Sequence, residues 1–517
     1  MKVATTEEMR EIDRRTIEER GIPGRDLMEQ AGTKIALGLS GFAEPGDAVL
    51  VLCGRGNNGG DGFVAARVLA NSEFQVYVLP VAGTENLSGD ARWAFEQVQG
   101  CRARLIDLPE SDDDLRELFR DADVILDAML GTGSKPPLRA PYDRIARILA
   151  HTPTPIVAAD IPSGLDATSG AGEDAVQAAL TVTIGLPKLG MLTANGWKKC
   201  GRVRIEPIQF PRDLLEDDAL CFETLTMDEV VRLLPDRPRD GHKGTFGLVL
   251  VCAGSKAMPG ASVVSGEGAL RSGAGLVRMH VPLANRLIVG QALPEALLAV
   301  FGQEDDTLAP LGDAQWEELL AKTSSVVFGP GVSRDEAVLG FFHQLLDHFE
   351  GPMVIDADGL SLVAEHEAIR RKLRPNCVLT PHPGEAARLL GCSTGDVQSD
   401  RWGAARELVS TLRCPVLLKG FGSLVARPDG RVTHCPPATT ALARGSSGDM
   451  LAGMVGGLLA QGMEPAEAAL LGTFVGVVAS DKAGAGGRST RGLRVLDVMA
   501  QISAAFAELE SHRQPNL

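Results

Sequence analysis

The chain has 517 residues, which is more than one ordinary hydrophobic core needs and favours two or three domains. It carries 51 lysines and arginines against 67 aspartates and glutamates, a net charge of −16 at pH 7. This balance argues against a nucleic-acid partner, because nucleic-acid-binding surfaces are basic. Backbone N–H groups can still bind small anionic molecules without net positive charge.

The nine cysteines are scattered from Cys53 to Cys435, with no Cys-x-x-Cys pair. This odd, scattered set argues against a disulfide framework or a zinc site and favours a reducing compartment. The start of the chain lacks the apolar core of a signal peptide, and no apolar run reaches the length of a membrane span. We therefore expect a cytoplasmic protein with no membrane partner.

Short β-rich runs alternate with helical patterns through the first half of the chain, which predicts a parallel α/β sheet. The clearest predicted strands are residues 48–54, 75–80, 124–127, 155–160 and 180–185. The alternation weakens after residue 208, through an acidic stretch at residues 216–218, before a new predicted helix at 227–234. We place the domain boundary at residues 212–222, which gives domains at 1–215 and 222–517.

The second half of the chain resumes the same alternation. Its predicted strands are residues 247–254, 276–281, 325–329, 353–356, 377–381 and 415–419, and its last predicted helices are residues 448–461 and 464–481. Both halves are therefore predicted to be doubly wound sheets, in which ligands bind beyond the carboxyl ends of the strands.

A glycine-rich segment, Asn57-Asn58-Gly59-Gly60-Asp61-Gly62, follows the first clear strand and opens a helix. The first turn of a helix presents unpaired N–H groups to an anion, and glycines allow a ligand to approach the backbone closely. Glycine-rich turns are nevertheless common, and this one is not G-x-G-x-x-G. Taken alone, the segment fits a structural turn as well as it fits a binding site.

Two later strand ends carry carboxylates, because Asp127 and Asp160 each follow an apolar run directly. Carboxylates at neighbouring strand ends converge on one crevice and repel each other unless a cation lies between them. Asn58, Asp127 and Ser163 offer hard oxygen ligands, which suit a hard cation better than they suit zinc.

Together, residues 57–62, 127–133 and 159–164 resemble the YjeF N-terminal family, the NAD(P)H-hydrate epimerases, and residues 7–13 and 27–32 match the start of that family. The resemblance covers about residues 1–212. It implies that Asn58, Asp127 and Ser163 hold a potassium ion. The substrate contacts that it implies are Asn57, Asn58, Gly59, Gly60, Asp61, Gly131, Thr132, Gly133, Ser134, Lys135, Pro136, Pro137 and Asp160.

Epimerisation at a hydrated carbon needs acid–base catalysis as the hydroxyl leaves and returns. We expect Asp160 to be the acid or base. Lys188, at a later strand end, is either its electrostatic partner or a solvated lysine. The chain departs from the family at Arg55, where proline is usual, and at Gln30, where asparagine is usual. Neither departure removes a residue expected to perform chemistry.

The second glycine-rich segment, Gly445-Ser446-Ser447-Gly448-Asp449, places an aspartate at a helix start. Backbone N–H groups there can form an anion hole for a phosphoryl group, while Asp449 accepts the proton of an attacking hydroxyl. Alone, the motif is better explained by a simple helix cap. Other strand ends supply companion motifs at residues 253–255, 328–331, 355–360, 379–385 and 417–423.

This ordered set resembles the ribokinase-like superfamily and, within it, the ADP- or ATP-dependent NAD(P)H-hydrate dehydratases, over about residues 225–510. The resemblance implies that the hydrate contacts Ala261, Gly331, His382 and Asp449, and that the adenine nucleotide contacts Lys419, Gly420, Phe421, Gly422, Ser423 and Gly448. It also implies that Glu385 holds magnesium through water and that Asp449 is the general base. Residues 444–447 depart from the family's usual Thr-Gly-Gly-Thr, and a serine at 446 is disfavoured if that position needs a positive φ.

The leading hypothesis is a two-domain α/β enzyme, Rossmann-like at the front and ribokinase-like at the back, that repairs hydrated nicotinamide nucleotides. It would interconvert the R and S forms of NADHX and NADPHX and dehydrate the S form with ADP, giving AMP and phosphate. The alternative is a kinase of a small alcohol fused to a non-catalytic ligand-binding domain. The implied cofactors are K⁺, Mg²⁺ and ADP, and ribokinase-like ancestry favours a homo-oligomer.

Overall fold

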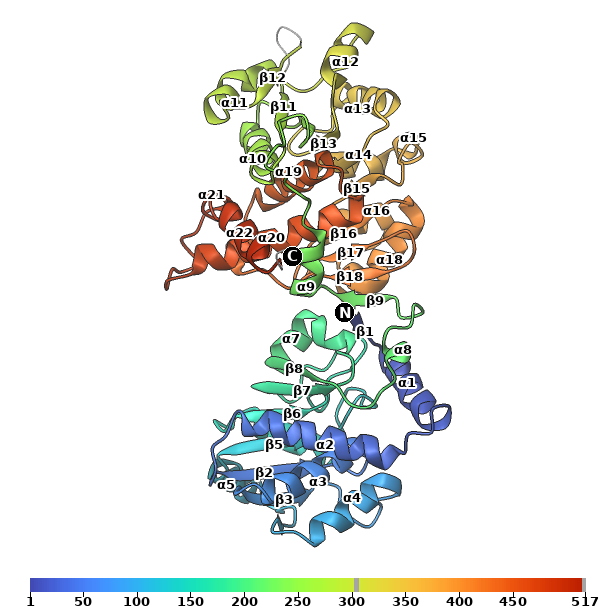
Figure 1. Cartoon of the computed structure of the whole chain (residues 1–517), viewed down its shortest axis with the longest axis vertical. Coiled ribbons are helices and arrows are strands. Elements are labelled where there is room, and N and C mark those ends of the chain that lie inside the picture. The colour runs from blue at the N-terminus through green and yellow to red at the C-terminus, as the bar shows by residue number, and fades with distance from the viewer. Residues whose placement is uncertain (302–305, 514–517) are drawn as a thin grey trace. The chain divides into compact units, whose positions relative to one another are not determined.

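The chain folds into two compact units that divide between Phe222 and Glu223. The computed structural model describes residues 1–301 and 306–513. The first unit begins at Lys2 and ends at Phe222, and the second contains Met1 and the chain from Glu223 onward. Figure 1 draws the first unit from blue to green and the second from green to red.

The first unit is built on a seven-stranded sheet in the order β4-β3-β2-β5-β6-β7-β8, with every neighbouring pair parallel. Its strands are β2 (Ala48–Cys53), β3 (Gln75–Pro80), β4 (Arg104–Leu105), β5 (Val124–Ala128), β6 (Ile156–Ala159), β7 (Leu180–Ile184) and β8 (Arg202–Glu206). The order reverses between β2 and β5, and ligands of open parallel sheets bind at such a switch point.

Helices cover both faces of this sheet. They are α1 (Thr6–Glu18), α2 (Gly24–Ser40), α3 (Asn57–Ala70), α4 (Gly89–Gln99), α5 (Asp112–Asp121), α6 (Tyr142–Leu149), α7 (Ala194–Cys200) and α8 (Arg212–Leu215), with a 3₁₀ turn η1 (Leu189–Leu192). A short strand, β1 (Lys2–Val3), precedes α1. One core joins α2, α3 and α4 to the sheet through Ile35, Leu39 and Phe63, and another joins α5 and α6 through Phe119 and Ile145. The sheet is therefore buried on both sides.

The second unit contains strands in the order β9-β18-β17-β16-β15-β14-β13-β10-β11-β12. They are β9 (Phe222–Thr224), β10 (Leu248–Cys252), β11 (Leu276–His280), β12 (Leu297–Ala299), β13 (Ser325–Phe328), β14 (Met353–Ile355), β15 (Cys377–Leu379), β16 (Val416–Leu418), β17 (Leu424–Ala426) and β18 (Val432–His434). The pairs from β12 across to β16 are parallel, whereas β16, β17 and β18 are antiparallel. The sequence alternation therefore missed an antiparallel ribbon at this side of the sheet.

The helices of the second unit pack around this sheet, and two of them lie in the core. The elements are α9 (Met227–Leu233), α10 (Pro259–Arg271), η2 (Leu283–Asn285), α11 (Arg286–Ala292), α12 (Asp313–Leu320), α13 (Glu336–His348), α14 (Asp358–Glu365), α15 (Glu367–Arg370), α16 (Pro383–Leu390), α17 (Thr394–Ser399), α18 (Arg401–Leu412), η3 (Thr440–Leu442), α19 (Ser447–Ala460), α20 (Pro465–Gly484), α21 (Val495–Met499) and α22 (Ile502–Ser511). Residues of α19 and α20 are largely buried. A Cβ on Gly453 of α19 would lie 2.0 Å from the carbonyl oxygen of Ser265, so glycine is required where α10 and α19 pack together.

The strands expected from the sequence coincide with β2, β3, β5, β6 and β7 and with β10, β11, β13, β14, β15 and β16, within one or two residues at each end. Seven further strands among the described residues were not expected: β1, β4, β8, β9, β12, β17 and β18. Among residues 1–301 and 306–513, none of the helices combines the length and apolar character that crossing a bilayer requires.

Candidate active sites

A pocket of about 300 Å³ opens in the first unit beside the switch point between β2 and β5. Its lining includes Asn57, Asn58 and Asp61 of α3 and the turn Gly131, Thr132 and Gly133 that follows β5. Asp160 after β6 and Lys188 after β7 complete this set. The topology therefore gathers residues from four strand ends into one cavity.

Some of the residues predicted to contact substrate do not line the pocket. A Cβ on Gly59 would lie 1.9 Å from the Gly54 carbonyl oxygen, and one on Gly60 would lie 2.6 Å from the Met28 side chain. Both glycines are thus needed for close packing of α3. Six predicted residues lie outside the pocket lining: these two glycines and Ser134, Lys135, Pro136 and Pro137.

Lys188 and Asp160 form a buried ion pair in this pocket. The Lys188 side chain is 1% exposed, and its ammonium donates to Asp160 Oδ1, to Thr183 Oγ1 at 2.9 Å and to the Ile184 carbonyl at 3.0 Å. Asp160 has φ 64°, a left-handed conformation that a non-glycine residue adopts at an energetic cost. The surrounding structure therefore holds the Asp160 carboxylate in one orientation against the ammonium.

Asp61 is a second carboxyl group in the same pocket. Burial raises the pKa of the Asp61 carboxyl well above its ordinary value, and the neighbouring charges of Asp160 and Asp13 raise it further. Burial therefore favours the neutral form of Asp61, whereas Asp160 has the Lys188 ammonium beside it. Two carboxyl groups with such different surroundings in one pocket are an arrangement suited to acid–base chemistry.

Asp127, at the end of β5, is fully buried beside Ser163. Its carboxylate accepts hydrogen bonds from Ser163 Oγ at 2.6 Å, Ser163 N at 2.8 Å and Met129 N at 3.2 Å. Burial raises its pKa to about 6 in spite of these bonds. Within the described residues, no cationic side chain pairs with it.

The Asn58 side chain lies against Gly131, in the turn that follows β5. The carboxylate of Asp127, the hydroxyl of Ser163 and the amide oxygen of Asn58 are hard oxygen ligands of the kind that fit a cation such as potassium. Among residues 1–301 and 306–513, no group of three or more His, Cys, Asp and Glu side chains is arranged to hold a metal ion.

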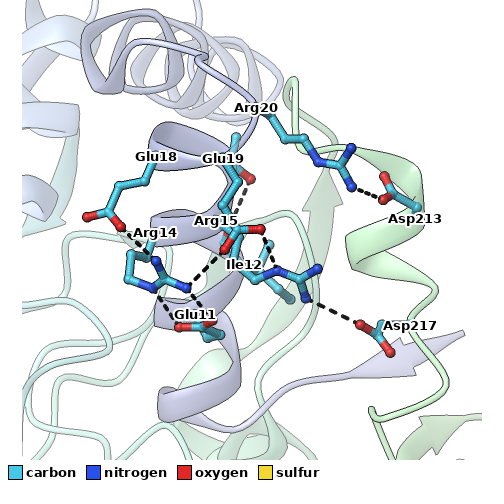
Figure 2. Close-up of polar contacts among 10 residues, drawn as sticks. Glu11, Ile12, Arg14, Arg15, Glu18, Glu19, Arg20, Asp213 and Asp217 are labelled. Atoms are coloured by element: carbon cyan, nitrogen blue, oxygen red, sulfur yellow. Dashed lines mark hydrogen bonds and ion pairs between the residues drawn. The ribbon is translucent and has the colours of Figure 1, made fainter.

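Helix α1 contributes residues to the pocket lining, and arginines on and just beyond the helix form ion pairs with Asp213 and Asp217. The chain enters α1 through Ala4, whose N–H donates to the Pro187 carbonyl at 3.0 Å, next to Lys188. Figure 2 shows ion pairs from the outer side, in which Arg15 lies 3.4 Å from Asp217 and Arg20 pairs with Asp213. The pocket-lining residues of α1 include Met9, Arg10 and Asp13.

A second pocket, of about 430 Å³, lies in the second unit between the turn after β16 and the start of α19. Five of the residues predicted to bind nucleotide line it: Lys419, Gly420, Phe421, Ser423 and Gly448. Gly422 lies outside the lining, and a Cβ there would come within 2.1 Å of His434 Nε2. The pocket is also lined by residues 436–440, 442 and 443, which were not predicted from the sequence.

Beneath this pocket, Lys419 and Asp356 form a second buried ion pair. Lys419 Nζ lies 2.7 Å from Asp356 Oδ1, which also accepts a 2.8 Å hydrogen bond from Thr380 Oγ1. Burial alone would lower the pKa of Lys419, but Asp356 and Glu385 outweigh it and raise that pKa. A Cβ on Gly448 would lie 3.1 Å from Lys419 Nζ, so the ammonium sits directly behind the first turn of α19.

Asp449, one residue later, has a pKa raised to about 6, first by burial and then by the charge of Asp356. Ser446, the residue before α19, has φ 67°. The position therefore adopts the left-handed conformation for which the family's usual glycine would be better suited. Asp449 and the anion-binding turn lie together, as a phosphoryl-transfer site requires.

His382 and Glu385 form the N-terminal cap of α16. Glu385 Oε2 accepts from the His382 N–H at 2.7 Å, and His382 Nδ1 accepts from the Gly384 N–H at 3.0 Å. Burial raises the pKa of Glu385 to about 7. Ala261 and Gly331 pack together elsewhere, since a Cβ on Gly331 would lie 2.9 Å from the Ala261 Cβ. None of these residues lines the 430 Å³ pocket, and neither does Asp449.

Three side chains at the two sites were missed as functional candidates: Arg10, Asp356 and Arg401. Asp356 follows an apolar strand directly, as Asp127 and Asp160 do, and that signal could have identified it. Arg401 donates to the Leu418 and Lys419 carbonyls at 3.4 Å and to the Phe421 carbonyl, so it supports the turn that lines the second pocket.

Comparison with known proteins matches two separate stretches of the chain to two different family models. Residues 24–190 match the family model described as YjeF-related protein N-terminus, and residues 249–498 match the model described as NAD(P)H-hydrate dehydratase. The chain is 34% identical over 526 residues to the bifunctional NAD(P)H-hydrate repair enzyme of Moorella thermoacetica, covering 99% of this chain and 97% of the relative. The corresponding enzyme of Thermofilum pendens is 35% identical over 514 residues, covering 98% and 97%.

One solved structure is similar to part of the chain. The ADP/ATP-dependent NAD(P)H-hydrate dehydratase of Bacillus subtilis, co-crystallised with ATP and Mg²⁺, is 28% identical and covers 56% of this chain and 99% of its own, with a TM-score of 0.48.

Proposed function

The chain belongs to the family of bifunctional NAD(P)H-hydrate repair enzymes, and we propose how its two sites divide that work. It is both an NAD(P)H-hydrate epimerase and a nucleotide-dependent NAD(P)H-hydrate dehydratase. We assign epimerisation to residues 1–215 and dehydration of the S form to residues 222–517.

For the epimerase, the Lys188–Asp160 pair carries the proposal. Asp160 gives a proton to the hydroxyl of the hydrate as it leaves as water and takes one back from the water that re-adds, and the Lys188 ammonium stabilises the carboxylate in between. Asp61, whose neutral form is favoured by burial, donates a hydrogen bond to the substrate in the same pocket. The turn at residues 131–133 and the first turn of α3 contact the nucleotide.

Asn58, Asp127 and Ser163 would hold potassium. The buried carboxylate of Asp127 and its 2.6 Å hydrogen bond from Ser163 Oγ support this assignment. A potassium ion held there would supply countercharge to the buried carboxylate. The turn after β5 carries Gly131, Thr132 and Gly133, which line the substrate pocket.

For the dehydratase, phosphoryl transfer followed by elimination accounts for the arrangement around Asp449. Asp449 accepts the proton of the hydrate's hydroxyl while the terminal phosphoryl group passes from the nucleotide to that oxygen. The N–H groups at Gly448 and the Lys419 ammonium stabilise charge on the phosphoryl oxygens. The lone pair of the ring nitrogen then expels phosphate as the C6–O bond breaks, and loss of a proton from C5, which the released phosphate can accept, restores the dihydropyridine of NADH.

We propose ADP as the phosphoryl donor, so that AMP and phosphate are the products. Glu385 is assigned to magnesium through water; its buried carboxyl near Lys419 and Asp356 supports this role. A bound magnesium ion supplies positive charge to the nucleotide phosphates. His382, Ala261 and Gly331 are assigned to the hydrate. Rates with ADP and with ATP, compared at equal concentration, test the choice of donor.

One experiment tests both activities. A mixed-epimer sample of NADHX is incubated with the protein, ADP and Mg²⁺, and recovery of NADH absorbance is followed. Full recovery, faster than spontaneous epimer exchange allows, requires both sites. Recovery that stops at the S fraction would exclude an active epimerase, and a product that stays phosphorylated would favour a kinase of a small alcohol.

A further inference from the structure

Arg10 of α1 is a cation at the epimerase pocket without a partner in the described residues. It lines the pocket, yet no hydrogen bond or ion pair joins it to another side chain or carbonyl in residues 1–301 and 306–513. A Cβ on Gly133 would lie 3.0 Å from Arg10 Nη2, so the guanidinium lies against the turn at residues 131–133.

The other arginines of this helix are engaged with carboxylates. Arg14 lies 2.7 Å from Glu11 and 2.6 Å from Glu18, and Arg15 lies 3.2 Å from Glu19 (Figure 2). Asp13, three residues from Arg10 and lining the same pocket, is at the spacing of a helical ion pair but forms none with it. Arg10 therefore differs from its neighbours in having its charge and donors available.

The pocket around Arg10 is otherwise acidic. Its carboxyl-bearing residues are Asp13, Asp61, Asp90 and Asp160, and its other cation, Lys188, is committed to Asp160. A phosphate in this pocket needs compensating donors. The first turn of α3 has no side-chain cap, which leaves its N–H groups available to an anion. Arg10 adds a full positive charge beside the 131–133 turn.

We propose that Arg10 binds a phosphate group of the hydrated nicotinamide nucleotide, an inference that rests on the proposed function. A guanidinium presents paired N–H donors that match phosphate oxygens bidentately. The substrate offers this chemistry at its diphosphate and, in NADPHX, at the 2′-phosphate of the adenosine ribose. Arg10 is then a substrate-binding residue contributed by the start of the chain.

The test compares Arg10→Gln with Arg14→Gln, an arginine one turn away that does not line the pocket. The R epimers of NADHX and NADPHX are supplied separately, and epimer exchange is coupled to excess Asp160→Ala chain as the dehydratase. Because hydrogen bonds to charged groups contribute about 1.5–3 kcal/mol, KM should rise roughly tenfold to a hundredfold in Arg10→Gln, with kcat changed less than about twofold. Arg10→Lys keeps the charge but loses the bidentate geometry and should show an intermediate KM.

A rise in KM for NADPHX alone assigns Arg10 to the 2′-phosphate, and a rise for both substrates assigns it to the diphosphate. Equal KM values for Arg10→Gln and Arg14→Gln would overturn the inference. If the wild-type chain exchanges no epimers, the proposed function fails. The inference is then tested by titrating both variants with 2′-phospho-ADP-ribose at saturating ADP, where weaker binding only in Arg10→Gln supports it and equal binding refutes it.

Discussion

The Lys419 ammonium lies 2.7 Å from the Asp356 carboxylate, and this pair is buried behind Gly448 at the start of α19. The phosphoryl site therefore has a fixed cation whose position depends on one carboxylate. Thr380 holds that carboxylate from the other side. The same carboxylate contributes to the raised pKa of Asp449, so Asp356 influences both the cation and the base.

Replacing Asp356 with asparagine keeps the side chain's shape but leaves the Lys419 charge without its partner. Breaking a buried pair in this way costs about 3 kcal/mol, so we expect the free energy of unfolding to fall by that order. The dehydratase kcat should fall at least about tenfold, the loss expected for roughly 1.4 kcal/mol of transition-state stabilisation. Denaturant unfolding and S-NADHX turnover measure these two effects. Epimer exchange by the same variant is the control and should not change.

Dehydration should depend on pH through Asp449. A general base must be ionised, and the pKa of this carboxyl is raised to about 6, so kcat/KM should fall as the pH decreases through that value. Asp449→Asn should lower the rate by about 10²–10⁴-fold and abolish the inflection. Initial rates between about pH 4 and pH 8, roughly two units below and above the inflection, provide the measurement. An inflection retained in Asp449→Asn would assign it to another group.

Lys188→Met should slow epimer exchange while leaving dehydration of S-NADHX intact. The substitution removes the ammonium that donates to Asp160, so negative charge on this carboxylate during exchange loses its stabilisation. Exchange between R and S forms is followed by chromatography, and kcat should fall at least about tenfold, the loss expected for roughly 1.4 kcal/mol of transition-state stabilisation. Unchanged exchange would show that Lys188 has no part in the reaction.

Potassium should stabilise the first unit as well as activate it. A ligand that binds only the folded state raises its stability by RT ln(1 + [L]/Kd), so the unfolding temperature should rise when K⁺ replaces tetramethylammonium at equal ionic strength. The effect should weaken as the pH falls below about 6, because Asp127 is then protonated. Asp127→Asn should abolish it. The same K⁺ response in wild type and variant would place the ion elsewhere.

Arg401→Gln should weaken nucleotide binding specifically. The guanidinium donates to three carbonyls of residues 418–421, and the turn it supports lines the second pocket. Loss of bonds from a charged donor costs about 1.5–3 kcal/mol, so KM for ADP should rise at least about tenfold. The saturated dehydratase rate should change less than KM. A fall in kcat at unchanged KM would contradict a role in shaping the turn.

Much of the first site could be predicted because its residues follow apolar runs directly. Asn58, Asp127 and Asp160 lie at or just after the ends of strands that the sequence shows as short apolar runs. Parallel strands bring such ends together at one edge of the sheet. Arg10 could not be found this way. It lies on a helix at the start of the chain, and its place in the pocket depends on tertiary packing that no local pattern encodes.

The second site shows a related limit. The ion pair of Lys419 with Asp356 spans 63 positions and requires the register of β14, β15 and β16, although each residue stands at a visible strand end. The strands β17 and β18 have three residues each, too few for a two-residue period to distinguish them from loop. Ser446 was identified as a departure from the family, and its φ of 67° shows that the position does adopt the left-handed conformation.

The division of the chain at Phe222 fixes the ratio in which the cell makes the two activities. Every translated copy supplies one epimerase unit and one dehydratase unit, so neither enzyme can be induced or degraded separately. The relative rates of epimerisation and dehydration are then set by the catalytic constants of the two units and not by their relative amounts.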